Sequence, residues 1–135
     1  MIFGEGANII LTNSDDAEDV GSVSVNGGGE VELSAPTSDL TGADGFSSVL
    51  FYQDRAGETK NNNSNTFNGG AEVDLQGALY FPSNDLDFSG GAAAGSGCMQ
   101  LIGLTVNVGG SAGVQGNCDT AGTRAVGRLT AKLGE

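Results

Sequence analysis

The sequence predicts an all-β protein, a parallel β-helix-like solenoid with ~20-residue coils. The first observation is a repeat: paired glycines followed by alternating apolar residues occur at residues 26–33 and again at 68–75. Weaker copies begin at Ser89 and Val108. The second observation is that short segments rich in Val, Leu and Phe are interrupted every few residues by Gly, Asn, Ser or Asp. This pattern is typical of short strands joined by turns.

The two strong copies of the repeat lie 42 residues apart. We interpret this distance as two turns of a ~21-residue unit, which predicts about five or six irregular, right-handed coils. On this basis residues 21–135 are expected to form the solenoid domain. Residues 1–20, which include the acidic run 15–19, are expected to form an acidic N-terminal cap or entry segment.

The individual elements follow from local periodicity. Val31 and Leu33 alternate with glutamates, which predicts a strand with one buried face. The continuous apolar run 49–52 predicts a strand that is covered on both faces. Residues 54–66 are polar and are expected to be a loop between coils.

The second half of the chain continues the pattern. The run 78–81 is expected to be a strand that Pro82 closes, and Leu86 and Phe88 then alternate with aspartates. Small residues at 90–97 predict a loose segment. The last full coil is expected to contain Leu101, Leu104, Val106 and Val108. Residues 124–133 are expected to form a C-terminal strand or short helix.

The composition excludes several classes of function. The formal net charge is −12, and the five basic residues begin only at Arg55. Such a surface repels phosphates, so nucleic acid and anionic membranes are not expected partners. The chain has no histidine, which excludes imidazole as a general base or metal ligand. Residues 1–5 lack the features of a secretory signal.

Cys98 and Cys118 are the only cysteines, and their separation is close to one coil. Equivalent positions on adjacent coils lie about 4.8 Å apart, a distance compatible with a disulfide. Closing this loop would contribute roughly 3 kcal/mol in the entropic model. The alternative is a pair of buried thiols in a reducing compartment. A disulfide favours export, so we expect a mature or excised piece of a longer exported protein.

An ordered set of motifs resembles the C-terminal region of TadG-like proteins of Flp/Tad pilus systems. The resemblance spans about residues 20–135, and the matching segments in chain order are 31–38, 49–55, 68–70, 77–82, 96–98 and 117–118. The resemblance implies an extracytoplasmic domain that an N-terminal membrane helix anchors, with a role in pilus assembly. It also implies that Cys98 and Cys118 are the paired family cysteines, and it brings no established catalytic residues. The family's anchor has no counterpart here, and the acidic residues 13–20 have none in the family.

Five residues are candidates for a binding surface because two similar strands carry adjacent aromatic side chains, with a charged pair after the first strand. They are Tyr52, Asp54, Arg55, Tyr80 and Phe81. In each strand one aromatic is expected to face the core and the other to face solvent, where it can contact a sugar ring or a protein. The alternative is that the aromatics pack beneath the polar loop.

Other chemistries fit the sequence less well. Residues 69–75 resemble a calcium-binding nonapeptide, but the fourth position is not glycine and the repeat is too long. Carboxylate catalysis would depend on Asp54 with Arg55, or on Asp85 with Asp87. These pairs are better explained as a turn and as the outer face of a strand. The threonines share no register that would form an ice-binding face.

The sequence therefore predicts a non-enzymatic, extracytoplasmic structural or adhesive domain associated with the bacterial envelope and Flp/Tad pili. The alternative is a secreted carbohydrate- or surface-binding solenoid module that self-assembles. The expected partners are envelope or pilus proteins, or surface glycans, and no cofactor or metal is expected. This segment is not expected to insert into a membrane. Self-association through the coil ends is expected, because open strand edges invite pairing.

Overall fold

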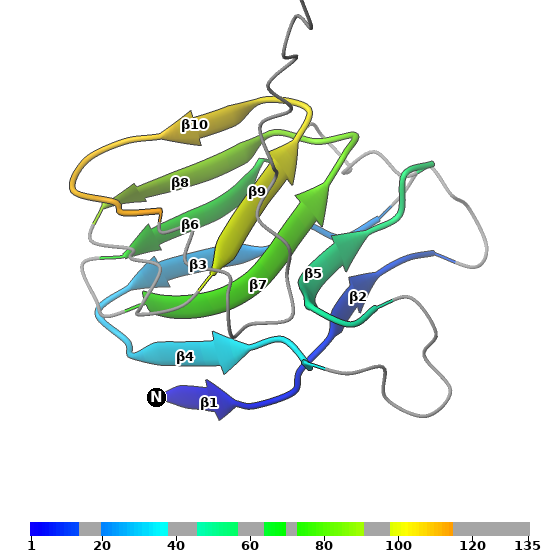
Figure 1. Ribbon diagram of the computed structural model, residues 1–135. Helices are drawn as coiled ribbons and strands as arrows, with labels where there is room; N and C mark the ends of the chain where they lie inside the picture. The colour runs from blue at the N-terminus through cyan, green and yellow to red at the C-terminus, as the bar shows by residue number, and fades with distance from the viewer. Residues whose placement is uncertain (14–19, 38–45, 57–63, 70–72, 91–97, 115–135) are drawn as a thin grey trace, which may run out of the picture.

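The computed structural model describes residues 1–13, 20–37, 46–56, 64–69, 73–90 and 98–114 (Figure 1). The regular structure of these ranges consists of strands. In chain order they are β1 (Ile2–Gly4), β2 (Ile9–Leu11), β3 (Ser24–Gly27), β4 (Val31–Ser34), β5 (Val49–Gln53), β6 (Asn65–Gly69), β7 (Val73–Phe81), β8 (Leu86–Gly90), β9 (Met99–Gly103) and β10 (Val106–Val108).

The strands form two sheets in which every pair is parallel. The first sheet has the order β1-β4-β7-β5-β2, and β9 also pairs with β7. This sheet is strongly curled, because the first half of β7 pairs with β4 and its second half pairs with β5 and β9 (Figure 1). The second sheet has the order β10-β8-β6-β3. The prediction of an all-β protein with parallel strands is confirmed at this level.

The spacing of the repeat was interpreted wrongly. Asn26 in β3 is the direct partner of Asn68 in β6, so the two strong copies lie side by side and 42 residues make one step between paired strands. The next steps along this sheet are about half as long, since Gly69 pairs with Gly90 and Phe88 pairs with Val108. Pairing follows the matching side chains, and the connections between strands differ in length. The second sheet has four described strands where five or six coils were expected.

The core lies between the sheets and follows the predicted alternation. In β4, Val31 and Leu33 are buried while Glu32 is exposed, and in β8 Leu86 and Phe88 are fully buried. Phenylalanines from both sheets meet in the interior, where the ring centroids of Phe51 and Phe67 are 5.3 Å apart. Burial of this kind stabilises a fold by about 1.5 to 3 kcal/mol for each large apolar side chain.

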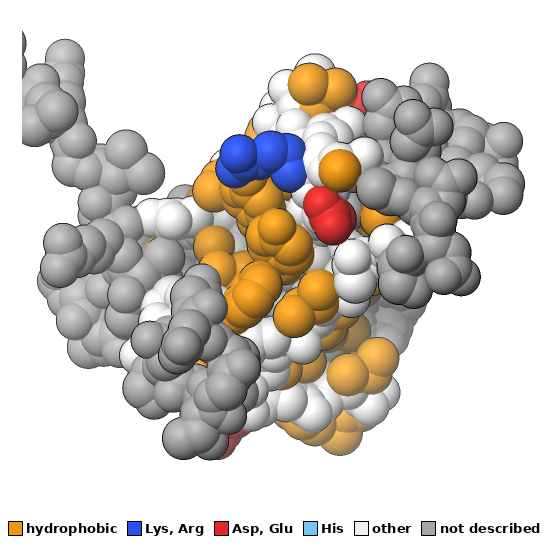
Figure 2. All heavy atoms as spheres, turned by 90° about the vertical axis from the view of Figure 1, so that its right-hand side faces the viewer, with side chains coloured by type: hydrophobic (Ala, Val, Ile, Leu, Met, Phe, Trp, Pro, Cys, Tyr) orange, Lys and Arg blue, Asp and Glu red, His pale blue; other side chains and the backbone are white. Residues whose placement is uncertain are grey.

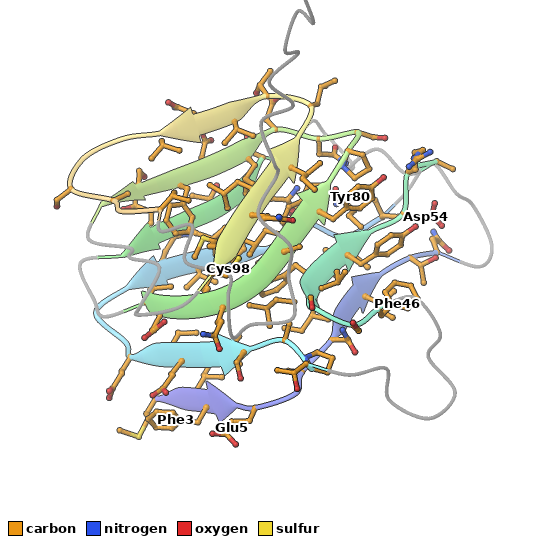
Figure 3. The ribbon with its side chains drawn as sticks, in the orientation of Figure 1. Phe3, Glu5, Phe46, Asp54, Tyr80 and Cys98 are labelled. Atoms are coloured by element: carbon orange, nitrogen blue, oxygen red, sulfur yellow. The ribbon has the colours of Figure 1, made fainter. Side chains whose placement is uncertain are left out.

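Two sequence predictions fall partly outside the described residues. Cys98 is fully buried immediately before β9, and Cys118 lies outside the described ranges, so their disulfide stays a prediction (Figure 3). The N-terminal segment contributes β1 and β2, which pair with β4 and β5 at the edges of the first sheet. Its acidic residues 15–19 lie outside the described part, and its role as a cap stays a prediction.

Strand β7 changes partners at Gly77, whose φ is +126°. Its N–H donates to the carbonyl of Cys98, and the next N–H, from Ala78, donates to the carbonyl of Ser48, both at 2.8 Å. A Cβ added at Gly77 would lie 2.6 Å from the Cβ of Ala35 and 3.1 Å from the carbonyl oxygen of Ser48. Glycine is therefore required here for both its backbone conformation and its lack of a side chain.

We expect Gly77→Ala to lower the free energy of unfolding by about 2 to 4 kcal/mol, because the left-handed backbone and the clash with Ala35 both oppose it. Chemical denaturation monitored by circular dichroism measures this loss. Gly29→Ala is the matched control, since an added Cβ there meets no atom within 4 Å. A loss at Gly77 no greater than that of the control would contradict this account of the curl.

Gln53 at the end of β5, Asn65 at the start of β6 and Asn84 form a buried polar cluster. The carbonyl oxygen of the Gln53 side chain accepts hydrogen bonds from the amides of Asn84, at 2.7 Å, and Asn65, at 3.4 Å. The Gln53 amide donates to the carbonyl of Gly21 at 2.9 Å, and the Asn65 side-chain oxygen accepts from the N–H of Val23 at 3.0 Å. Asn65 was predicted to belong to a loop; it starts β6 and is fully buried.

We expect Gln53→Leu to lower the free energy of unfolding by about 2 to 4 kcal/mol, because it removes the acceptor shared by Asn65 and Asn84 from a buried site. The matched control is Gln76→Leu, which makes the same change at a partly exposed position of β7. The control should change stability by less than about 0.5 kcal/mol. Equal losses for the two variants in urea denaturation would show that the cluster contributes nothing specific.

Candidate functional site

An exposed row of apolar side chains crosses the first sheet. The strand register places Ile10 of β2 beside Tyr52 of β5, Tyr52 beside Tyr80 of β7, and Tyr80 beside Ile102 of β9. We call these four residues the outer row. They point away from the core because side chains alternate along a strand, and their neighbours Phe51 and Leu79 are buried inside. The prediction that one aromatic of each strand faces outward is confirmed.

The tyrosine rings of the outer row cover one another. The centroids of Tyr52 and Tyr80 are 5.4 Å apart with an interplanar angle of 11°, which is a stacked geometry. On the same side of the sheet, Phe46 meets Tyr52 edge to face at 5.1 Å and 89°. Such contacts contribute about 0.5 to 1.5 kcal/mol each beyond the burial of area. The outer row therefore presents ring edges and aliphatic side chains to solvent, with part of each ring face already occupied.

Arg55 places a positive charge at one side of the outer row. Its Nη2 and Nε atoms donate to the hydroxyl oxygen of Tyr80 at 2.6 and 3.2 Å. This hydrogen bond raises the pKa of Arg55. A guanidinium is charged at physiological pH in any case. The Ser83 hydroxyl donates a hydrogen bond to the backbone carbonyl of Arg55, which helps to hold the turn that carries Arg55 in place. Figure 2 shows the positive group beside a continuous band of hydrophobic side chains.

The other two predicted site residues have structural roles. Asp54 accepts a hydrogen bond from the N–H of Ala56 at 3.0 Å and one from the Thr12 hydroxyl at 3.3 Å, so it stabilises the turn after β5. Phe81 is fully buried, and its ring lies 6.2 Å from that of Phe51 in the core. Phe81 therefore cannot contact a ligand at the surface. Of the predicted site residues, the structure brings together Tyr52, Arg55 and Tyr80. Ile10, Ile102 and Phe46 are further residues of the same surface.

Those three additional residues were missed as site residues in the sequence. Ile10 and Ile102 occur in apolar runs, where one position in two faces outward, and only the register identifies which side chains continue the tyrosine row. Phe46 precedes β5 and carries no periodic signal. In the sequence, the available signal for Ile10 was that it is apolar and has an apolar residue on each side.

The carboxylate pairs considered for catalysis act as links between strands. Asp85 accepts a hydrogen bond from the Thr105 hydroxyl at 2.6 Å, and Asp87 accepts one from the Asn107 amide at 3.2 Å. Both contacts join residues 85–87, at the start of β8, to residues 105–107, at the start of β10, as expected for the outer face of a sheet. Residues 70–72 of the calcium-like motif lie outside the described ranges. Among the described residues, no group of three or more His, Cys, Asp or Glu side chains is placed to hold a metal ion.

A shallow acidic groove of about 490 Å³ lies on the outer face of the β1-β4-β7 part of the first sheet. Glu32 of β4 is in register with Asp74 of β7, and Glu5 follows β1 at the same side (Figure 3). The signal in the sequence was a carboxylate at the same position of both repeat copies. Neighbouring like charges repel, so this groove is unfavourable for anionic ligands.

No protein-family model, curated protein or solved structure matches this chain. The resemblance to TadG-like proteins therefore rests only on the motifs quoted above. Within the described part, no helix has the length and apolar character that a membrane crossing requires.

We expect the stacked tyrosines to be energetically coupled. In a double-mutant cycle of Tyr52→Ala and Tyr80→Ala, the coupling free energy for unfolding should be about 0.5 to 1.5 kcal/mol. Tyr80→Phe is the control, since it keeps the stacked ring and removes the hydroxyl that accepts from Arg55. The coupling to Tyr52 should persist in that background, and strictly additive losses would contradict a stabilising stack.

Proposed function

We propose that this chain is a non-enzymatic, extracytoplasmic domain with a structural or adhesive role at the bacterial envelope, in association with Flp/Tad pili. The observation that carries the proposal is the outer row: four in-register apolar side chains on a sheet face, with Arg55 at its edge. Exposed aromatic and aliphatic side chains beside an arginine have the composition of a protein-binding surface.

We also propose that the two sheets belong to a parallel β-helix-like solenoid. Three observations support this architecture: every strand pair is parallel, the first sheet curls at Gly77, and successive strands alternate between the two sheets from β5 to β10. In a solenoid, equivalent strands of successive coils stack on one another, so equivalent side chains form long, regular rows on the surface. Such rows suit a role in binding or scaffolding.

A protein partner fits the outer row better than a glycan does. A sugar ring binds by lying on an open aromatic face, and the Tyr52 and Tyr80 rings cover each other while Phe46 meets Tyr52. The exposed ring edges and the side chains of Ile10 and Ile102 instead form a ridge that can pack into an apolar groove. The glycan-binding module is therefore the weaker alternative.

The extracytoplasmic location is supported by the cysteines and by the resemblance. A disulfide between Cys98 and Cys118 would persist only in an oxidising compartment. The pilus association rests on the motifs shared with TadG-like proteins, which imply a domain held outside the inner membrane.

The proposal predicts that the purified chain binds to the isolated envelope or sheared pili of the producing cell and not to its cytosolic fraction. Tyr52→Ser combined with Tyr80→Ser should weaken this binding at least about tenfold, because it removes the centre of the outer row. Co-sedimentation with a labelled chain measures the binding. Asn68→Ser is the matched control, since it shortens an exposed side chain on the other sheet.

Two outcomes would contradict the proposal. The first is equal binding of the tyrosine variant and the control, provided that both retain the circular dichroism spectrum of the native chain. The second concerns the native polypeptide: if it fractionates with the cytosol and both cysteines react with an alkylating reagent without reductant, the extracytoplasmic role is wrong.

A further inference from the structure

The exposed guanidinium of Arg55 has no carboxylate partner in the described part of the chain. Arg55 is the one basic side chain of the described ranges. Carboxylates are common in the same ranges, at Glu5, Glu30, Glu32, Asp54, Asp74, Asp85 and Asp87. The groups that raise the pKa of Arg55 are the hydroxyl of Tyr80 and, to a smaller extent, Tyr52, with no carboxylate among them. The positive charge of Arg55 is therefore not compensated by an ion pair.

Asp54, the nearest carboxylate in the sequence, is engaged elsewhere. One of its oxygens accepts a hydrogen bond from the N–H of Ala56 at 3.0 Å, and the other accepts one from the Thr12 hydroxyl at 3.3 Å. These bonds keep the Asp54 carboxylate in the turn after β5 and connect it to the residue that follows β2. Asp54 and Arg55 are thus adjacent in the chain and do not pair with each other.

The Tyr80 hydroxyl occupies one side of the Arg55 guanidinium and leaves another side for a ligand. The bonds to Tyr80 come from Nε and Nη2, at 3.2 and 2.6 Å. The end formed by Nη1 and Nη2 also has two parallel N–H groups, and it meets no acceptor among the described residues. Two parallel N–H groups match the two oxygens of a carboxylate, which is the geometry of a bidentate pair.

Arg55 is also held in place before any partner arrives. Tyr80 fixes its side chain, and the Ser83 hydroxyl donates to its backbone carbonyl. Tyr80 is itself stacked on Tyr52, with ring centroids 5.4 Å apart. An arginine that is already ordered loses less conformational entropy on binding, so more of the interaction free energy remains as affinity.

The surroundings of Arg55 favour a single carboxylate of a protein over a polyanion. A phosphate-rich surface brings many negative charges towards a chain whose net charge is −12, and one guanidinium cannot offset that repulsion. A single aspartate or glutamate brings one charge. The neighbouring Ile10 and Ile102 are 47% and 41% exposed, so the matching surface must be apolar beside its charge, as protein interfaces are.

We propose that Arg55 binds an aspartate or glutamate of the protein partner through its Nη1 and Nη2 atoms, while the outer row packs into an apolar groove beside that carboxylate. Tyr80 is then a positioning residue, because it orients Arg55 in addition to its own packing. The contact excludes water from the pair, which strengthens its electrostatic attraction. This role of Arg55 rests on the envelope role proposed above and adds the chemistry of the partner's surface.

The test uses the full chain and the envelope or pilus fraction that it binds in the co-sedimentation assay. One portion of the fraction is left native. In the other, carbodiimide and glycinamide convert the exposed carboxylates into neutral amides. Arg55→Gln removes the guanidinium, and Asn68→Asp is the matched control, since it makes the same change in net charge at an exposed position of the second sheet.

On the native fraction we expect Arg55→Gln to bind about ten- to hundredfold more weakly than the wild type, and Asn68→Asp to stay within about twofold of it. On the amidated fraction the wild type and Arg55→Gln should bind equally, because the carboxylate that distinguishes them is gone. Comparing two variants on one fraction cancels the general change in charge repulsion that amidation causes.

Two further variants test the geometry. Arg55→Lys keeps the charge and loses the pair of parallel N–H groups, so it should bind the native fraction with an affinity between those of the wild type and Arg55→Gln. Tyr80→Phe keeps the ring of the outer row and removes the acceptor that orients Arg55. It should weaken binding to the native fraction and leave binding to the amidated fraction unchanged, whereas a purely structural effect would reduce both.

The possible failures are distinguishable. If Arg55→Gln binds the native fraction as tightly as the wild type while the double serine variant of the tyrosines binds weakly, this inference is wrong and the proposed function stands. An effect of Arg55→Gln that persists on the amidated fraction means that Arg55 contacts another group, such as a phosphate, and also overturns the inference. A wild type that binds neither fraction overturns the proposed function itself. Circular dichroism establishes that each variant is folded.

Discussion

The described structure depends on one constraint, the parallel pairing of strands in register. Parallel pairing places residues of the same kind directly beside one another, so an inward phenylalanine such as Phe67 lies next to Phe88 and an outward tyrosine lies next to another tyrosine. A shift of one residue would turn every side chain of a strand to the other face. The core and the outer row therefore both depend on the same strand register.

Two bends of the chain require different chemistry. At Gly77 the backbone adopts a conformation that only glycine reaches without strain, so a single strand serves two partners. Beyond the end of β5 the polar side chains of Gln53, Asn65 and Asn84 satisfy one another and the nearby backbone. Buried amides of this kind are costly unless each hydrogen bond is made, so they specify one arrangement of the turn.

The surface and the ends follow from the same rows. A row that is buried between two neighbours is stable, and the same row becomes an exposed apolar surface where the neighbours stop, as at Ile2 and Val108. The outer row, in contrast, is exposed at Ile10 and Ile102 and half-buried at its two tyrosines, which gain stability from stacking. The described residues therefore offer two kinds of apolar surface, the ridge of the outer row and single exposed side chains in the last strands of the interior rows.

The sequence by itself determined the strands and their inner and outer faces, because period-2 alternation is a local property, as in Val31-Glu32-Leu33 and in the segment around Phe88. It also predicted that one aromatic of each of the strands 49–52 and 78–81 faces outward, without deciding which one. Only the tertiary structure decided which strands are neighbours: Asn26 pairs with Asn68 at a distance that was counted as two coils, because connections vary in length without changing the pairing. Membership of Ile10 and Ile102 in the outer row, and the burial of Phe81 and Asn65, depend on contacts between distant segments, which no local pattern contains.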